Sequence, residues 1–178
     1  MTLIELELQN YKQFKYKKIE FKSGINILFG QNEKGKSTIV DALLTLFYTE
    51  PTSNSKNLLG YITSWLVDEK PNLTLVFESN GIIYKLNKNF QTRKSTLIAD
   101  NIQLDDSKKI NELLAKFLGI TTEEIYNSVA IFKGAEMFEV SKDQKLKVLL
   151  TGLSTGADGN ALEAVKLIEK DIQEIKRG

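Results

Sequence analysis

The sequence contains no cysteine and no histidine. Without cysteine there is neither a disulfide framework nor a thiol nucleophile, and without histidine the commonest general base and metal ligand is missing. An excess of charge of either sign is also lacking, because 24 lysines and arginines are balanced by 23 aspartates and glutamates and the net charge is +1. Any surface for nucleic acid must therefore be a local patch, since the chain has no overall basic field.

Long hydrophobic runs are absent as well. No apolar run reaches the length of a membrane span, and Glu5 and Glu7 interrupt the N-terminus where a signal peptide needs an apolar stretch. We therefore expect a cytoplasmic protein with no membrane partner. The 178 residues, 42% hydrophobic and 26% charged, can bury a globular core, and their number favours one domain with room for an inserted subdomain.

Residues 30–37, with the sequence GQNEKGKS, are the most informative segment. They match the phosphate-binding pattern G-x-x-x-x-G-K-[ST] at all fixed positions, which average residue frequencies produce in about one chain per hundred of this size. The apolar run Ile25–Phe29 predicts a buried strand before the loop, and Thr38–Tyr48 predicts a buried helix after it. This order directs backbone N–H groups at phosphate oxygens.

Each residue of this loop has an expected role. Gly30 and Gly35 permit backbone angles and a close approach of phosphate that a Cβ would obstruct. The Lys36 ammonium would bind the β and γ phosphates, and the Ser37 hydroxyl would ligate Mg²⁺. The alternative is a glycine turn with a surface lysine. The predicted nucleotide-binding residues here are Asn32, Glu33, Lys34, Gly35, Lys36, Ser37 and Thr38, with no catalytic residue beyond Lys36.

Alternating residues around the loop predict antiparallel strands. Thr2–Gln9 alternates apolar and polar side chains, and Phe14–Phe21 predicts the returning strand. The polar stretch Glu50–Leu59 predicts a surface loop. Further strands, with a hairpin turn at Ser79-Asn80-Gly81, are expected in a β-rich subdomain at roughly 72–104; they cover 73–78, 82–86, 96–99 and 102–104.

Helical patterns follow. A helix is predicted from Ser107 to Gly119, and capping boxes at 121–124 and 141–144 predict two more helix starts, with a buried strand at 129–132 between them. Domain 1–158 would be followed by the root of a coiled coil at 159–178, although a plain amphipathic helix fits the spacing equally well. The residues with this spacing are Ala161, Val165, Ile168, Ile172 and Ile175.

An acidic partner for Mg²⁺ is hard to find in the sequence. Hydrolysis of a nucleoside triphosphate needs such a residue on a neighbouring strand. The segment Trp65–Glu69 ends in Asp-Glu after apolar residues, but Pro71 follows closely, so a surface turn or helix end is the favoured alternative to a metal site. The chain therefore has the features of half an active site.

Two blocks carry a family resemblance. Residues 8–14 read L-Q-N-Y-K-Q-F, and residues 19–43 read I-E-F-K-S-G-I-N-I-L-F-G-Q-N-E-K-G-K-S-T-I-V-D-A-L. They resemble the opening and the phosphate-loop block of the SMC-like DNA-repair ATPases of the SbcC type, with RecN and RecF as more distant relatives. Weaker similarity continues through 81–90 and 118–134.

The resemblance implies an α/β fold: the N-terminal lobe of a P-loop, ABC-ATPase-like head, with an antiparallel β subdomain and the start of a coiled coil. In such proteins a C-terminal lobe supplies the signature segment and the acidic strand, and two heads enclose two ATP molecules with Mg²⁺ and clamp DNA. The implied partners are the C-terminal lobe of the same protein, a second head, DNA bound non-specifically and a nuclease of the SbcD kind. This chain alone is expected to be nearly inactive, and a prokaryotic protein of this kind would associate with the nucleoid.

Two residues depart from the family pattern. Lys12 replaces an arginine that is expected to contact ATP, with a solvated surface lysine as the alternative. Lys133 stands where the family places a glutamine that reaches Mg²⁺; a lysine cannot ligate the metal, although its ammonium could contact the γ phosphate. Two basic clusters could bind DNA phosphates; alternatively, they only keep the exposed faces of their strands soluble. The clusters are Lys15, Lys17 and Lys18, and Lys85, Lys88, Arg93 and Lys94.

Three functions remain open from the sequence. The first is an ATP-driven DNA-repair ATPase completed by its second lobe. The second is a binding module in which ATP causes dimerisation with little hydrolysis, as Lys133 would favour. The third is an unrelated small P-loop kinase or GTPase.

Overall fold

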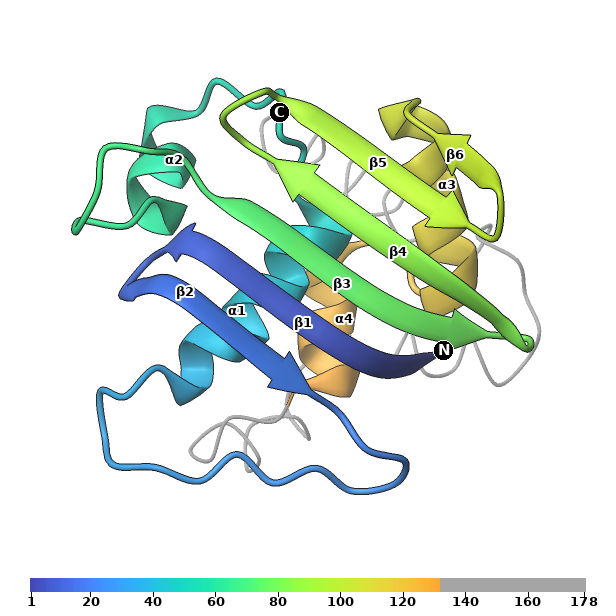
Figure 1. Cartoon of the computed structure of the whole chain (residues 1–178), viewed down its shortest axis with the longest axis horizontal. Coiled ribbons are helices and arrows are strands. Elements are labelled where there is room, and N and C mark those ends of the chain that lie inside the picture. The colour runs from blue at the N-terminus through green and yellow to red at the C-terminus, as the bar shows by residue number, and fades with distance from the viewer. Residues whose placement is uncertain (132–178) are drawn as a thin grey trace, which may run out of the picture. The chain divides into compact units, whose positions relative to one another are not determined.

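The computed structural model describes residues 1–131. The chain divides into two compact units between Glu123 and Glu124, and nearly all of the described elements belong to the first (Figure 1). Lys133, the capping box at 141–144, the boundary at 158 and the proposed coiled-coil root at 159–178 lie outside the described residues. Within residues 1–131, no helix is both long and apolar enough to cross a membrane.

Six antiparallel strands form a single sheet in the order β2-β1-β3-β4-β5-β6 (Figure 1). The two strands predicted at the N-terminus are confirmed, and the strands of the 72–104 region continue the same sheet because β3 pairs with β1. The strands are β1 Thr2–Tyr11, β2 Phe14–Glu20, β3 Asn72–Ser79, β4 Ile82–Asn89, β5 Lys94–Ala99 and β6 Ile102–Leu104.

One face of the sheet carries the core. The register pairs Leu6 with Leu75, Leu75 with Leu86, and Leu86 with Leu97 across four neighbouring strands. All four leucines are buried, and full burial of such a side chain stabilises a fold by about 1.5–3 kcal/mol. This row of leucines fixes the register of β1, the strand that leads to the candidate site.

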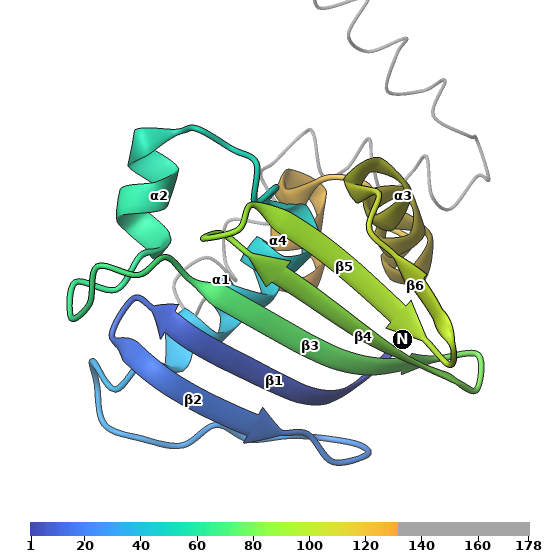
Figure 2. The same ribbon diagram turned by 45° about the horizontal axis from the view of Figure 1, so that its top comes forward.

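Helices α1 (Lys36–Tyr48) and α3 (Ser107–Leu118) pack on the core face (Figure 2). The buried helix predicted after the loop is confirmed, since Ser37 is the one exposed residue of α1. The helix predicted at 107–119 is also confirmed, although Asp106 rather than Ser107 caps it, by accepting hydrogen bonds from the backbone of the first turn. Its Phe117 ring lies 4.8 Å from the Tyr84 ring between centroids.

Two predictions of local structure outside the phosphate-loop region are wrong. The stretch 50–59, predicted as a surface loop, contains the start of α2 (Lys56–Ile62), because the Ser55 hydroxyl accepts a hydrogen bond from Leu58 N and caps a helix there. The segment 129–132, predicted as a strand, begins within the last turn of α4 (Glu123–Ala130). Short apolar runs do not distinguish a strand from a helix by themselves.

Lys88 corrects the second basic cluster. It pairs with Leu73 and Ser95 on the core face of the sheet and is completely buried, so it cannot bind DNA. Its Nζ donates to the Thr49 carbonyl at the C-terminal end of α1, at 2.8 Å. Burial lowers the pKa of Lys88 to about 8, against a smaller opposing effect of Glu50.

This buried ammonium predicts a pH-dependent stability. The Lys88 pKa of about 8 lies below the ordinary value of 10.5, so the unfolded chain binds the extra proton between these values and stability rises with pH there. We expect the free energy of unfolding to gain about 2 kcal/mol from pH 7 to 9.5 through this residue. Urea unfolding across this range should show the rise in the wild type and in Lys85→Met, at an exposed position of the same strand, but not in Lys88→Met. Equal slopes in all three proteins would contradict the assignment.

Candidate nucleotide-binding site

The strand predicted before the phosphate loop is not formed. Residues 25–29 have no strand partner among the described residues, and their side chains face solvent: Ile25 is 94% exposed, Ile27 85% and Phe29 99%. A strand that is apolar on both faces is stable only with neighbouring strands beside it and helices over it. Among residues 1–131 the six-stranded sheet provides no partner strand for this segment, because its edge strand β2 pairs only with β1.

The phosphate loop itself leads directly into α1. Gly35 occupies the N-cap position with φ of 85°, and the helix begins at Lys36. Lys36 Nζ donates to the carbonyl oxygens of Gly30 and Gln31, at 2.7 Å each. The ammonium is therefore folded back into the loop, and two carbonyl oxygens take the place of the anionic oxygens it is expected to bind.

The other predicted residues of the loop are accessible. The side chains of Asn32, Glu33, Lys34 and Ser37 are exposed, whereas Gly35 and Thr38 are buried. Ser37 is exposed in the first turn of α1, and its role as a Mg²⁺ ligand stays a prediction. The structure thus brings the predicted loop residues together around the N-terminal end of α1.

The turn between β1 and β2 packs against this helix end. A Cβ at Gly35 would collide with the Gln13 amide and the Phe14 ring. Gln13 also accepts a hydrogen bond from the Thr38 hydroxyl, at 3.1 Å. No sequence pattern marks Gln13, yet its side chain lies against Gly35 and bonds to Thr38, so it connects the turn to the N-cap and the first turn of α1.

Lys12 lies in the same turn, with φ of 49°, but it is not a solvated surface lysine. It is 7% exposed, and its Nζ is 2.5 Å from Asp41 Oδ2 on α1. The ammonium also lies 3.6 Å from the centroid of the Tyr61 ring, and the Tyr61 hydroxyl donates to the same Asp41 oxygen at 3.2 Å. The expected contact of Lys12 with ATP stays a prediction.

Asp41 and Tyr61 were not identified from the sequence. One signal for Asp41 was available: it follows Ser37 by four residues, so the two side chains share one face of α1. Nothing local pointed to Tyr61, because α2 was not predicted. The same helix face also carries Thr45, whose hydroxyl is hydrogen-bonded to the buried Tyr11 hydroxyl at 2.9 Å. Burial raises the pKa of Tyr11 well above its ordinary value.

The segment Trp65–Glu69 forms the surface turn that was favoured over a metal site. Asp68 and Glu69 are exposed, and Glu69 accepts a hydrogen bond from the Asn10 side chain at 3.1 Å. In the part of the chain that the structure describes, no group of three or more acidic, histidine or cysteine side chains could hold a metal ion. Ser37 is thus the one predicted Mg²⁺ ligand among residues 1–131.

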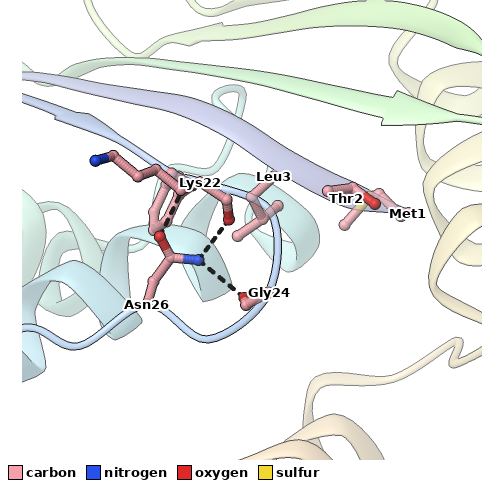
Figure 3. Close-up of a pocket in the computed structure, with 7 residues that line it drawn as sticks. Met1, Thr2, Leu3, Lys22, Gly24 and Asn26 are labelled. Atoms are coloured by element: carbon pink, nitrogen blue, oxygen red, sulfur yellow. Dashed lines mark hydrogen bonds between the residues drawn. The ribbon is translucent and has the colours of Figure 1, made fainter.

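An open pocket of about 440 Å³ lies away from this junction, at the beginning of β1 (Figure 3). Residues 1–3 and the turn at 21–26 line it. Asn26 Nδ2 donates to the carbonyls of Lys22 and Gly24, at 2.8 and 3.2 Å, and thereby holds the turn. These contacts satisfy the polar groups within the turn itself, so the pocket has the character of a surface hollow.

The first basic cluster remains on the surface. Lys15 and Lys17 are exposed on the edge strand β2, and Lys18 forms an ion pair with Glu5 at 2.9 Å. In the second cluster Lys85 and Lys94 are exposed, whereas Lys88 is buried and Arg93 donates to the Thr52 carbonyl at 2.6 Å. The clusters are separated by β1 and β3 in the sheet.

The packing at Gly35 predicts a large effect of a single methyl group. Gly35→Ala places a side chain at positive φ, which costs about 1–2 kcal/mol, and drives it into Gln13 and Phe14, which costs about 1–3 kcal/mol more. Gly24→Ala is the matched control, since its φ is 88° but no atom lies within 4 Å of its added Cβ. Urea unfolding should show the larger loss at Gly35. Equal losses would mean that the close contact is absent in solution.

The ion pair of Lys12 predicts a further stability difference. Asp41→Ala leaves the buried Lys12 ammonium without its carboxylate and should lower the free energy of unfolding by about 1.5–3 kcal/mol. Glu5→Ala removes the partner of the exposed Lys18 and should have a much smaller effect. Chemical denaturation of both variants measures the difference, and an Asp41→Ala protein as stable as Glu5→Ala would contradict it.

Comparison with known proteins places these features in a family. The AAA domain family matches residues 5–177. The DNA double-strand break repair Rad50 ATPase of Saccharolobus solfataricus is 25% identical over 99% of this chain and 21% of its own length. The corresponding Rad50 ATPase of Archaeoglobus fulgidus is 36% identical over 49% of this chain and 10% of its own length. The chain thus spans about a fifth or less of these relatives.

Other relatives agree. The DNA replication and repair protein RecF of Limosilactobacillus fermentum is 29% identical over 56% of this chain and 30% of its own length. A solved SMC ATPase structure, from work on ATP-driven dimerization and DNA stimulated activation of these ATPases, aligns with a TM-score of 0.55 at 18% identity, over 85% of this chain and 98% of its own. The fold and the phosphate loop therefore agree with the family match. The chain belongs to the AAA domain family, and in sequence and fold it resembles the N-terminal lobe of SMC-like, Rad50-type ATPases.

Proposed function

We propose that this chain binds ATP and Mg²⁺ as the N-terminal half of a DNA-repair ATPase head. The observation that carries the proposal is the Lys36 ammonium, held inside the loop 30–37 at the N-terminal end of α1. A helix N-terminus and a lysine that converge on one loop favour an anion with several charged oxygens. A triphosphate is such an anion.

Each residue of the loop would bind a different part of the nucleotide. Lys36 would exchange its two carbonyl partners for β- and γ-phosphate oxygens, and the backbone N–H groups of 32–35 would surround them. Thr38 would turn its hydroxyl from Gln13 to the α phosphate. Bound at Ser37, Mg²⁺ would supply neutralising charge for the phosphates. Lys12 and Lys133 are proposed as further contacts to ATP.

The second lobe is proposed as the partner that completes the site. The exposed apolar residues of 25–29 support this, because their sequence is that of a strand buried on both faces. A C-terminal lobe of the same protein would supply strands beside this segment, the acidic ligand of Mg²⁺ and the signature segment. Covering these side chains would remove the largest apolar exposure near the loop from water.

We further propose that ATP joins two such heads and that the joined heads clamp DNA. The exposed lysines Lys15 and Lys17 are suited to phosphate contacts without sequence preference. A nuclease of the SbcD kind is the proposed protein partner. The match to the AAA domain family supports the ATPase over an unrelated kinase or GTPase. The measurement below distinguishes the ATPase from a binding module with little hydrolysis.

We expect negligible ATP hydrolysis by this chain alone and Mg²⁺-dependent hydrolysis when the C-terminal lobe is added. Lys36→Ala should abolish ATP binding and hydrolysis with an unchanged circular dichroism spectrum, because the loop loses the cation proposed to bind the β and γ phosphates. Lys17→Ala, which removes an exposed charge from β2, is the control and should keep both.

Phosphate release and ATP titration measure these outcomes. Unchanged ATP affinity in Lys36→Ala would contradict the assignment of residues 30–37 as the phosphate-binding loop. ATP-dependent dimerisation of the completed head with background turnover would select the binding module instead of the ATPase. Robust turnover by this chain alone would show that the site needs no second lobe.

A further inference from the structure

The turn between β1 and β2 consists of Lys12 and Gln13, and its Gln13 amide lies against the first turn of α1. A Cβ added at Gly35 would collide with Gln13 Nε2, so the amide nitrogen is in contact with the N-cap of the helix. The Thr38 hydroxyl donates to Gln13 Oε1 at 3.1 Å. The amide therefore spans the start of α1, with its oxygen at Thr38 and its nitrogen at Gly35.

The nitrogen end of this amide is an unused donor. A glutamine amide carries two N–H donors, and within residues 1–131 Gln13 Nε2 donates no hydrogen bond. The bond from Thr38 determines which end of the amide faces Gly35. Lys12, the other residue of the turn, has its ammonium engaged by Asp41 at 2.5 Å. The half-buried Gln13 is therefore the residue of this turn that has donors to spare.

The surroundings of Gln13 Nε2 favour an anion. Gly35 provides no side-chain cap for α1, and no acidic residue lies in the first turn of the helix. The first N–H groups of the helix thus form the positive end of its dipole without a side-chain acceptor at the N-cap. An anion at this end of α1 would meet N–H groups from the helix on one side and from the Gln13 amide on the other.

We propose that Gln13 Nε2 donates to the α phosphate of the nucleotide whose phosphates occupy the loop 30–37. The proposal rests on the proposed function, in which the Thr38 hydroxyl turns to the same phosphate. That rotation releases Gln13 Oε1, and the amide nitrogen, already at the helix N-cap, then donates to the phosphate beside Thr38. The turn between β1 and β2 thereby binds the nucleotide together with the loop.

Substitutions of Gln13 test the contact by calorimetric titration with ATP and with ADP, each with Mg²⁺. Gln13→Ala should weaken both nucleotides about tenfold, because each loses one hydrogen bond to a charged oxygen and both carry an α phosphate. Gln13→Glu should weaken both about a hundredfold, since the carboxylate keeps the length of the side chain and the acceptor for Thr38 but places a negative charge where the donor was.

Gln91→Glu is the matched control. Gln91 is exposed, and its Oε1 also accepts a hydrogen bond, from Lys70 N at 3.2 Å. The substitution makes the same change of charge and keeps the acceptor, and it should alter neither affinity by more than about twofold, because salt screens an exposed charge. Urea unfolding checks the fold of each variant. If Gln13→Ala does not fold, the comparison of Gln13→Glu with Gln91→Glu still decides.

A double-mutant cycle separates a direct contact from an effect through Thr38. Thr38→Val removes the hydroxyl and keeps the shape of the side chain. A direct contact predicts that Gln13→Ala weakens ADP binding about tenfold in the Thr38→Val protein as well. A glutamine that only holds the Thr38 hydroxyl would have no further effect in that protein, since the two substitutions would remove the same interaction.

Four results would overturn the proposal. Failure of the wild type to bind either nucleotide would overturn the proposed function and the Gln13 contact with it. Wild-type affinity in both Gln13 variants would overturn the contact alone and leave the phosphate loop assigned. A loss confined to ATP would contradict the α phosphate as the acceptor. A loss that disappears in the Thr38→Val protein would show that Gln13 is a positioning residue without its own contact to the nucleotide.

Discussion

The close approach of Gly35 to the turn between β1 and β2 is the constraint on which the candidate site depends. Only a residue without a Cβ, at positive φ, lets the chain pass Gln13 and Phe14 and enter α1 at Lys36. That entry point decides where the helix N-terminus aims its free N–H groups and where the Lys36 ammonium lies. The row of leucines across four strands holds β1, and so the turn, in a fixed position. Packing in the core thus determines the geometry at the phosphate loop.

Two buried lysines tie α1 to the sheet from opposite ends of the helix. Lys12, next to the N-terminal end, is paired with Asp41 and the Tyr61 ring, so its charge is compensated by a carboxylate and a π-face. Lys88 has only the Thr49 carbonyl at the C-terminal end, where the helix macrodipole favours a cation. Burial lowers the pKa of Lys88 to about 8, against a smaller opposing effect of Glu50. Charge burial costs stability at both positions, and what it provides is a defined orientation for α1.

Much of the fold and of the loop was predictable, and the failures have physical causes. Alternation is clearest in the inner strands β1, β3, β4 and β5, which have a buried face, whereas the edge strands β2 and β6 contain no buried residue. The strand predicted at 25–29 is not formed because its apolar pattern is that of a strand with other strands on both sides, and the described sheet provides none for it. The prediction that Lys88 lies on the surface was wrong because a charged side chain is expected in solvent unless the strand register is known. The register places Lys88 on the core face. Asp41 and Tyr61 were overlooked because their role consists of holding another side chain.

The sequence by itself determined the phosphate loop, the strand pattern and the family resemblance, because each is written in local spacing of residue types. Tertiary structure alone decided which charges are buried and that Lys12 faces Asp41 and Tyr61. These facts depend on contacts between residues far apart in the chain, such as Lys12 with Ile62 and Gln13 with Thr38. Spacing along the sequence carries no record of such contacts, and only packing of the sheet against α1 brings them about.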